Sequence, residues 1–361
     1  MKTRTSRYIL IAAALAVILA VPAIWIMIRA DEVPTFSLAW SEYPSWSAFG
    51  VAHEFGFING KKGEIGPIEK KWGVDIELKE ADYDTCLVMY GSGKCDAVCI
   101  TNMDALIPCL TRKSVGILPT STSFGADACI VDARITDIQQ LRGKKVYGLA
   151  KTVSEYCFVR NVEILGEKEA DFRFTNMDPA AAALAMQQKR DGFDAIVVWN
   201  PFVLETLNKR KDARVLFDST TIPGEIIDMV VMTQESLDKP GGDKFAWAVI
   251  DAFYTINQQM AKSETRDETL IALGEKFSNL DLNSMRKVVQ QTRFYSSPEE
   301  GIKVLGKEAT AGIMEKVVAF CVSHEIVPEA PAVGFGSRAE AKEVAFRLDP
   351  AYIKGYVAKS K

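Results

Sequence analysis

An alternation of strand-like and helix-like segments, which occurs twice, is the feature that most limits how this chain can fold. Short apolar runs rich in β-branched residues alternate with longer helical segments, first from residue 35 onward and again over roughly residues 130–222. Such βαβ units build a mostly parallel sheet with helices on both faces. Two of them in 361 residues predict an α/β protein with two lobes rather than one small core.

The expected elements set the boundaries that we predict for these lobes. Strands are expected at 35–40, 74–81, 96–101, 144–150 and 194–199. A helix is expected to begin within MDALIPCL, and the chain after residue 233 is expected to be mostly helical. We therefore expect lobe I to comprise residues 31–123 and 230–361. Lobe II, with the hinge crossings, is expected to comprise residues 124–229.

The first thirty residues form a separate segment. Lys2, Arg4 and Arg7 precede an uncharged apolar run over residues 8–28, a pattern that directs export and leaves the basic end in the cytoplasm. The run is longer than the roughly 7–15 residues of a signal peptide core and reaches the ~20 residues that span a bilayer. Residues 1–30 are thus either a signal peptide or an anchor that would associate with the membrane through residues 8–28. The body is expected in the periplasm or outside the cytoplasmic membrane.

Composition and charge exclude several classes of protein. Hydrophobic residues make up 48% and charged residues 25%, which is ordinary globular composition. Beyond residue 30 the chain carries 39 basic and 47 acidic side chains. A body with that excess of acid lacks the Lys/Arg surface by which proteins bind nucleic acid or an anionic membrane face.

Sequence motifs for catalysis and for cofactors are missing. There is no G-x-G-x-x-G after a strand, no phosphate-binding P-loop, no G-x-S-x-G and no H-E-x-x-H. The two histidines, His53 and His324, have no telling partners. We therefore expect no enzyme activity, no cofactor and no metal. The chain has seven cysteines: Cys86, Cys95, Cys99, Cys109, Cys129, Cys157 and Cys321. We expect them to be buried apolar side chains, with at most one pair oxidised to a disulfide.

Polar and aromatic residues gather where the expected strands end. In open parallel sheets a ligand binds outside the carboxyl ends of the strands, so these residues are the candidates for a binding site. The alternative is structural, because Thr101/Asp104 and Thr152/Glu155 fit a helix capping box and the aromatic residues could belong to the core. The predicted ligand-binding residues are Trp40, Glu42, Tyr43, Trp46, Asn102, Asp104, Thr152, Ser154, Glu155, Trp199, Asn200 and Asp228.

Six motifs in consistent order over residues 35–354 carry a resemblance to a known family. They are TNMDAL (101–106), GADACIV (125–131), TVSEYCFVRNVEILG (152–166), VVWNPFV (197–203), IPGEIID (222–228) and RLDPAYI (347–353). The chain resembles the periplasmic substrate-binding proteins of the nitrate/sulfonate/taurine (NitT/TauT) class of ABC importers, nearest the branch associated with urea or guanidine carboxylases. The resemblance implies a type II periplasmic-binding-protein fold and a cleft between lobes that holds a small-molecule solute. It also implies an ABC permease and an ATPase as partners.

Two other functions stay open on the same fold. One is a ligand-sensing ectodomain, and the other is a protein similar to those of pyrimidine biosynthesis. For the ligand itself, helix N-termini favour anions, but Asp104 and Glu155 would occupy those first turns, and Glu42 and Asp228 add further acid. A urea-, guanidine-, amine-, amide- or pyrimidine-like solute is therefore favoured, and a sulfonate- or nitrate-type solute stays the alternative.

Overall fold

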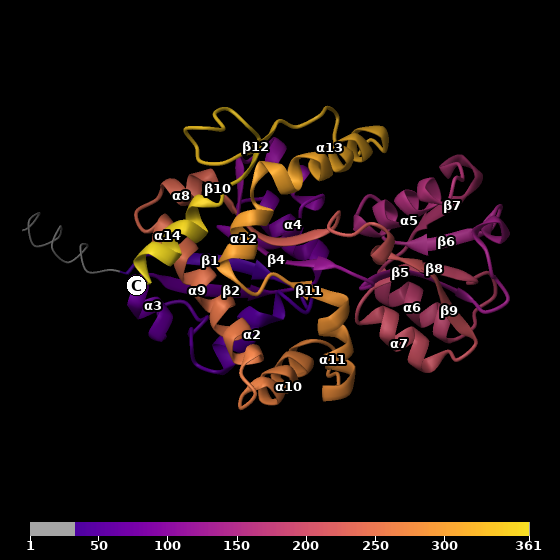
Figure 1. Ribbon diagram of the computed structural model, residues 1–361, viewed down its shortest axis with the longest axis horizontal. Coiled ribbons are helices and arrows are strands. Elements are labelled where there is room, and N and C mark those ends of the chain that lie inside the picture. Colours follow the sequence, from indigo (N-terminus) through magenta and orange to yellow (C-terminus); the bar gives the residue numbers. More distant parts are fainter. Residues whose placement is uncertain (1–32, 361) are drawn as a thin grey trace, which may run out of the picture. The chain divides into compact units, whose positions relative to one another are not determined.

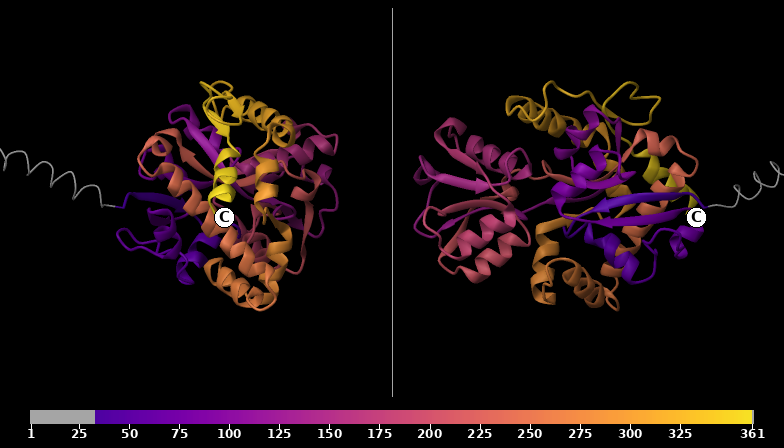
Figure 2. Two further views of the ribbon diagram at one scale, coloured as in Figure 1. Left: turned by 60° about the vertical axis from the view of Figure 1, so that its left-hand side comes forward. Right: turned by 180° about the vertical axis from the view of Figure 1, so that it is seen from behind.

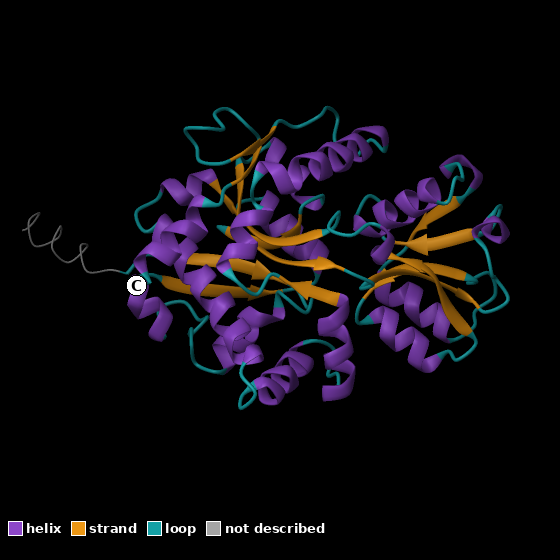
Figure 3. Cartoon of the chain, in the orientation of Figure 1, coloured by secondary structure: helices purple, strands orange, loops and turns teal. Residues whose placement is uncertain are grey.

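The structure, a computed structural model, describes residues 33–360 and divides them between two β-sheets, each with its own helices (Figure 1). We call the part built on the eight-stranded sheet lobe I and the part built on the five-stranded sheet lobe II. Figure 3 shows the strands of the two lobes as separate groups. The alternation in the sequence therefore produces the predicted α/β fold with two lobes. The predicted segment at residues 1–30 lies outside the described residues.

The eight-stranded sheet of lobe I has the order β12-β13-β4-β10-β3-β1-β2, with β11 paired to β4. Its strands are β1 (Thr35–Trp40), β2 (Asp75–Glu80), β3 (Ala97–Thr101), β4 (Ser114–Ser123), β10 (Ile227–Thr233), β11 (Thr292–Phe294), β12 (Val333–Phe335) and β13 (Phe346–Leu348). The central strands β3, β4 and β10 are buried along their whole length. This burial explains why their sequences read as nearly continuous apolar runs.

The helices of lobe I cover this sheet on both faces, as the two views of Figure 2 show. They are α2 (Ser47–Glu54), α3 (Pro67–Trp72), α4 (Tyr83–Gly91), α8 (Gln234–Asp238), α9 (Gly242–Ala261), α10 (Arg266–Lys276), α11 (Leu282–Gln291), α12 (Pro298–Val304), α13 (Lys307–Ser323) and α14 (Ala351–Lys359). Within residues 33–360, no helix is both long enough and apolar enough to cross a membrane.

Lobe II contains the strand order β7-β6-β8-β5-β9. Its strands are β5 (Asp127–Asp132), β6 (Lys145–Gly148), β7 (Arg173–Asn176), β8 (Ala195–Trp199) and β9 (Ala213–Asp218), and its helices are α5 (Val153–Ile164), α6 (Pro179–Gln187) and α7 (Phe202–Lys209). Thr152 and Asp178 cap α5 and α6 by accepting hydrogen bonds from backbone N–H groups of the first turn. The cap that the sequence offered at Thr152 therefore marks the start of α5.

Two expectations about these elements need correction. The sheets are mixed rather than mostly parallel. In lobe I the chain leaves along β4 and returns antiparallel along β10, and in lobe II it enters along β5 and leaves antiparallel along β9. The helix expected within residues 103–110 is a pair of short 3₁₀ turns, Asp104–Leu106 and Pro108–Leu110. Pro108 lacks the N–H that a continuing α-helix would need at that position.

The two chain crossings between the lobes run side by side. Residues 124–126 carry the chain from β4 to β5, and residues 219–226 carry it from β9 to β10. The Oγ atoms of Ser123 and Ser219 lie 2.7 Å apart, and the Gly125 N–H donates to Ser219 Oγ at 2.8 Å. Gly125 has a φ of +94°, which other residues adopt only with strain. The predicted lobe boundaries stay a prediction, and the one at residues 229/230 falls inside β10.

Candidate functional site

A cavity of about 440 Å³ is lined by residues of both lobes at the ends of several strands. Lobe I contributes the turn after β1, the start of α4 and Asp228 of β10. Lobe II contributes Asp127 at the start of β5, Trp199 at the end of β8, and the starts of α6 and α7. Its volume lies within the range of roughly 300–1,000 Å³ that ligand pockets occupy.

Strand register explains why these side chains converge. Asp127 is paired with Trp199 across the β5–β8 ladder. Asp228 is paired with Thr101 of β3 on one side and with Ser121 of β4 on the other. Each pairing brings residues distant in sequence to the same edge of a sheet, which is the edge that the cavity occupies.

Five aromatic side chains form one wall of the cavity: Tyr43, Trp46, Tyr83, Trp199 and Phe202. Trp46 stacks on Tyr83 with ring centroids 5.4 Å apart, and Tyr83 meets Trp199 of lobe II edge-to-face at 6.3 Å. At the two ends of this row, Tyr43 contacts Trp46 and Phe202 contacts Trp199. The wall therefore continues from one lobe to the other and presents ring faces and edges to whatever the cavity holds.

Asp104 fixes the position of Tyr83 within this wall. The Tyr83 hydroxyl donates to Asp104 Oδ2 at 2.7 Å and accepts from the Thr101 N–H at 3.1 Å. The Thr101 hydroxyl donates to the same carboxylate oxygen at 2.8 Å. Burial raises the pKa of Asp104 to about 6, although the hydrogen bonds that it accepts from the Tyr83 and Thr101 hydroxyls lower it. Asp104 thus acts behind the cavity wall and positions a ring rather than lining the cavity itself.

Two buried carboxyl groups, Asp127 and Asp228, lie at the inner end of the cavity, and each is 2% exposed. Ser121 donates to Asp228 Oδ2 at 2.5 Å, and Ser45 lies 2.8 Å behind Ser121. Burial raises the pKa of Asp127 to about 7. The pKa of Asp228 is raised well above its ordinary range by burial and then by the negative charge of Asp127. Two acids this close ionise together only at a cost, which a bound positive charge would remove.

The charges that line the cavity all have one sign. Seven carboxylates line it: Glu42, Glu80, Asp82, Asp84, Asp127, Asp178 and Asp228. Its lining includes no lysine, arginine or histidine, and none of the seven carboxylates forms a salt bridge with a residue in the described range 33–360. The cavity therefore has negative charge that the lining does not balance.

Three comparisons with known proteins give a fold but no family. No protein-family model and no curated protein matches the chain. Among solved structures, the aliphatic sulphonate binding protein SsuA from Escherichia coli matches with a TM-score of 0.65 at 16% identity, over 83% of this chain and 90% of that one. The alkanesulfonate-binding protein SsuA from Xanthomonas axonopodis pv. citri, bound to MOPS, matches with a TM-score of 0.64 at 13% identity, over 88% and 99%.

A third match comes from a eukaryote. The Candida albicans CA3427 gene product, described as having the generic periplasmic binding protein fold, matches with a TM-score of 0.59 at 14% identity, over 90% of this chain and 95% of that one. This chain has the periplasmic-binding-protein fold. Identities this low establish the fold alone. The residues that line the cavity are the evidence on the ligand.

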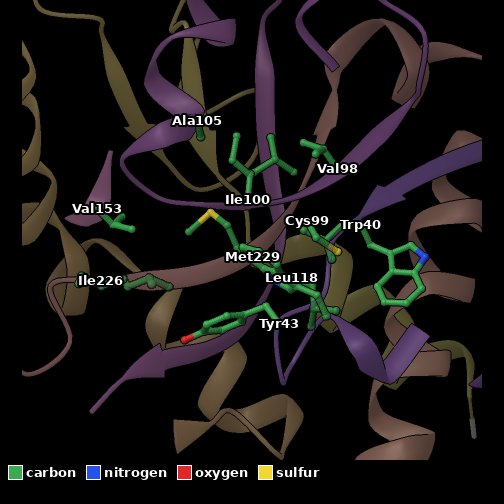
Figure 4. Close-up of a cluster of buried hydrophobic side chains, with 14 of the residues drawn as sticks. Trp40, Tyr43, Val98, Cys99, Ile100, Ala105, Leu118, Val153, Ile226 and Met229 are labelled. Carbon is green, nitrogen blue, oxygen red and sulfur yellow. The ribbon is translucent and has the colours of Figure 1, made fainter. Parts of the chain in front are cut away.

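Five of the twelve predicted site residues line the cavity of this binding-protein fold: Glu42, Tyr43, Trp46, Trp199 and Asp228. The structure brings them together from both lobes. Glu42 lies at the exposed side and accepts from Ser278 Oγ at 2.9 Å. Tyr43 is 5% exposed, and its hydroxyl has no hydrogen-bond partner among the described residues. In Figure 4 the Trp40 and Tyr43 rings lie at different sides of the core cluster, and the Tyr43 hydroxyl points away from Trp40.

The other seven predicted residues do not line the cavity, and most of them have a structural role. Trp40 is in the core, where its ring leaves room only for a glycine at position 50. Asn102 bridges the second crossing by donating to Glu225 O and accepting from the Ile227 N–H. Asp104 accepts a hydrogen bond from the Tyr83 hydroxyl, and Thr152 caps α5. Ser154 is fully buried. Glu155 accepts a hydrogen bond from the Lys151 N–H, and Asn200 donates one to Gln291 Oε1.

Sequence reasoning missed several residues that line the cavity, above all Tyr83 and Asp127. Tyr83 stands at the first position of α4, and Asp127 at the first position of β5. Most of the residues predicted from the sequence stand where a strand is followed by a helix. A strand that enters from the other lobe runs antiparallel, so its first residue lies at the same edge of the sheet as the ends of the parallel strands. The motif GADACIV, in which Asp127 begins such a strand, could have indicated this.

The described residues show neither a disulfide nor a cluster of metal ligands. All seven cysteines are buried and free, which leaves no oxidised pair. Within residues 33–360 no three His, Cys, Asp or Glu side chains converge in a way that could hold a metal ion.

Proposed function

We propose that this protein is the extracytoplasmic solute-binding component of an ABC importer of the NitT/TauT class and that it binds its solute without chemical change. The periplasmic-binding-protein fold supports this role, as do the solved structures of the same fold, two of which are named as sulfonate-binding proteins. The basic residues and the apolar run at 1–28 support export. A permease and an ATPase are the partners that such a component requires.

The solute that we propose is an organic nitrogen cation, such as an amine or a guanidine. The observation that carries this proposal is the lining of the cavity, with seven carboxylates, no basic side chain and no salt bridge to any of the seven from residues 33–360. A sulfonate in this cavity would lose its hydration and meet only like charge. A cation would neutralise carboxylates that have no positively charged partner within residues 33–360.

The aromatic wall supports the same class of solute. A cation over the face of Trp or Tyr is attracted by the ring quadrupole, by roughly 0.5–2 kcal/mol for each contact. Trp46, Tyr83 and Trp199 offer such surfaces next to the buried carboxylates. This combination distinguishes the cavity from a site for sulfonate, which needs donors and positive charge.

Isothermal titration of the full chain in detergent tests the proposal. The probes are guanidinium and n-butylammonium as cations, urea as a neutral control, and ethanesulfonate and nitrate as anions. We expect binding of at least one cation and no detectable binding of either anion. Asp228→Asn, which keeps an acceptor for Ser121, should weaken cation binding about tenfold or more, because a hydrogen bond to a charged group is worth roughly 1.5–3 kcal/mol.

The matched control is Asp191→Asn, which removes one exposed carboxylate outside the cavity and should leave binding unchanged. Tight binding of ethanesulfonate or nitrate, with no response to either cation, would contradict the proposed solute. Conversion of a probe into a product would contradict the proposed role as a binding protein.

A further inference from the structure

Five of the seven carboxylates of the cavity fall into two groups that differ in depth. Asp127 and Asp228 form an inner pair on strands β5 and β10, each 2% exposed. Asp82, Asp84 and Asp178 form an outer group of exposed side chains at the starts of α4 and α6. Both groups line the same cavity.

A third buried polar group, the Tyr43 hydroxyl, lies beside the inner pair. A buried and unpartnered polar group beside it points to a ligand there, because the Tyr43 hydroxyl is buried, lines the cavity and has no hydrogen-bond partner within residues 33–360. A buried hydroxyl without a partner destabilises the fold, and a ligand that bonds to it would remove that penalty. The charges of Asp127 and Asp228 both act on Tyr43, so the three groups are neighbours.

The outer group brings acids of both lobes together. Asp84 belongs to lobe I and Asp178 to lobe II, and they are near enough that the charge of Asp178 contributes to raising the pKa of Asp84, after burial and the charge of Asp82. No lysine or arginine of the described chain forms a salt bridge with any of the three. A positive charge placed between α4 and α6 would therefore relieve repulsion across the mouth of the cavity.

The surface that connects the two groups is aromatic rather than charged. Trp46, Tyr83 and Trp199 form it through the ring contacts described above. Tyr83 directly follows Asp82 at the start of α4, and Trp199 pairs with Asp127 in the sheet. An apolar chain that lies on these rings would have one end at the inner pair and the other at the outer group.

We infer that the solute is a linear dication, with an ammonium-type group at each end of a short apolar chain, of the class of the α,ω-diamines. This inference rests on the proposed function and narrows it. The inner ammonium contacts Asp127, Asp228 and the Tyr43 hydroxyl. The chain lies along Trp46, Tyr83 and Trp199, and the outer ammonium is held between Asp84 and Asp178.

The size of the cavity supports a solute longer than guanidinium or urea. Each of these has four non-hydrogen atoms, whereas a volume of about 440 Å³ is many times the roughly 30 Å³ of one water molecule in the liquid. A small monocation would also leave one group of carboxylates unpaired. A dication pairs both groups and joins residues of the two lobes in a single contact.

Titration of the full chain in detergent with paired series tests the inference at 0.15 M salt, where charges farther apart than about 8 Å are screened. One series contains α,ω-diammonium ions of three to eight carbons, and the other contains n-alkylammonium ions of the same lengths. We expect a diammonium ion of one optimal length to bind at least tenfold more tightly than its monoammonium counterpart. An optimum is expected because the two carboxylate groups lie at fixed positions.

The double variant Asp84→Asn/Asp178→Asn separates the two ends. Asn caps a helix about as well as Asp, so α6 should keep its cap. The variant should lose the diammonium advantage, because its affinity for the diammonium ion should fall to about that of the monoammonium counterpart, and Asp191→Asn should change neither affinity. Equal binding of the two series at every length would overturn the dication and leave the proposed function intact. Binding of ethanesulfonate and of no ammonium ion would overturn both.

Discussion

Replacing Asp127 by asparagine should stabilise the unliganded protein while it weakens the binding of cations. Asp127 is 2% exposed, lies beside Asp228, and forms no salt bridge with the described residues. The ionised form of this carboxyl group is therefore disfavoured in the folded protein. Removing the charge removes that cost, which is the expected relation between stability and function at a binding site.

The magnitude follows from the pKa of this carboxyl group. Burial raises the pKa of Asp127 to about 7, against about 3.9 in an unfolded chain. The folded protein therefore holds a proton that the unfolded chain has released between these pH values, and stability falls as the pH rises through that window. The cost is about 1.5 kcal/mol at pH 5 and about 4 kcal/mol at pH 8, where it is nearly complete.

Urea unfolding of the parent protein and of Asp127→Asn at pH 5 and pH 8 measures this difference. The free energy of unfolding of the variant, relative to the parent, should rise by about 2.5 kcal/mol from pH 5 to pH 8. Asp191→Asn, which changes an exposed carboxylate, should show no such rise. A variant that is equally destabilised at both pH values would refute the reasoning, because Asp127 would then be a satisfied structural carboxylate.

Three further predictions concern Trp199, Asn102 and Glu225. Trp199→Ala should weaken cation binding about three- to tenfold in titration calorimetry, and Trp199→Phe should restore most of it, because a cation–π contact contributes roughly 0.5–2 kcal/mol. Asn102→Ala should lower the free energy of unfolding by about 2 kcal/mol in urea, since it removes two buried hydrogen bonds to the second crossing. Glu225→Gln should cost up to about 3 kcal/mol at pH 7. Burial raises the pKa of Glu225, but hydrogen bonds from Arg160 and Lys316 outweigh it and hold the pKa at about 2, so the loss should fade in unfolding measurements as the pH drops from about 4.5 toward 2.

The sequence predicted the elements of this fold well because their signals are local. The apolar strands at 35–40 and 97–101 lie where their apolar runs indicated them, and α5 begins beside the capping pair Thr152/Glu155. The direction of the strands after each crossing is not a local property. It depends on which lobe the chain enters next, so the antiparallel pairing of β4 with β10 could not be deduced from either strand alone.

The candidate site was predicted less completely, for a physical reason. A residue at the end of a strand can point into the cavity or away from it, and hydrogen bonds made by distant residues decide which. Asn102 and Asp104 come just after Thr101, the last residue of β3. Asn102 forms hydrogen bonds to the second crossing and Asp104 accepts one from Tyr83, so neither side chain lines the cavity. The excess of acid was visible from the sequence. The absence of any basic residue from the lining required the fold.

The seven buried thiols make the protein a convenient reporter of its own opening. Burial raises the pKa of Cys86 and Cys95, as it does that of Cys109 and Cys321, to about 12, so hardly any reactive thiolate is present at neutral pH. A maleimide dye should therefore react with a cysteine engineered at the mouth of the cavity while the native ones remain unlabelled. Slow labelling of native cysteines would then record transient unfolding of the elements that bury them, one element at a time.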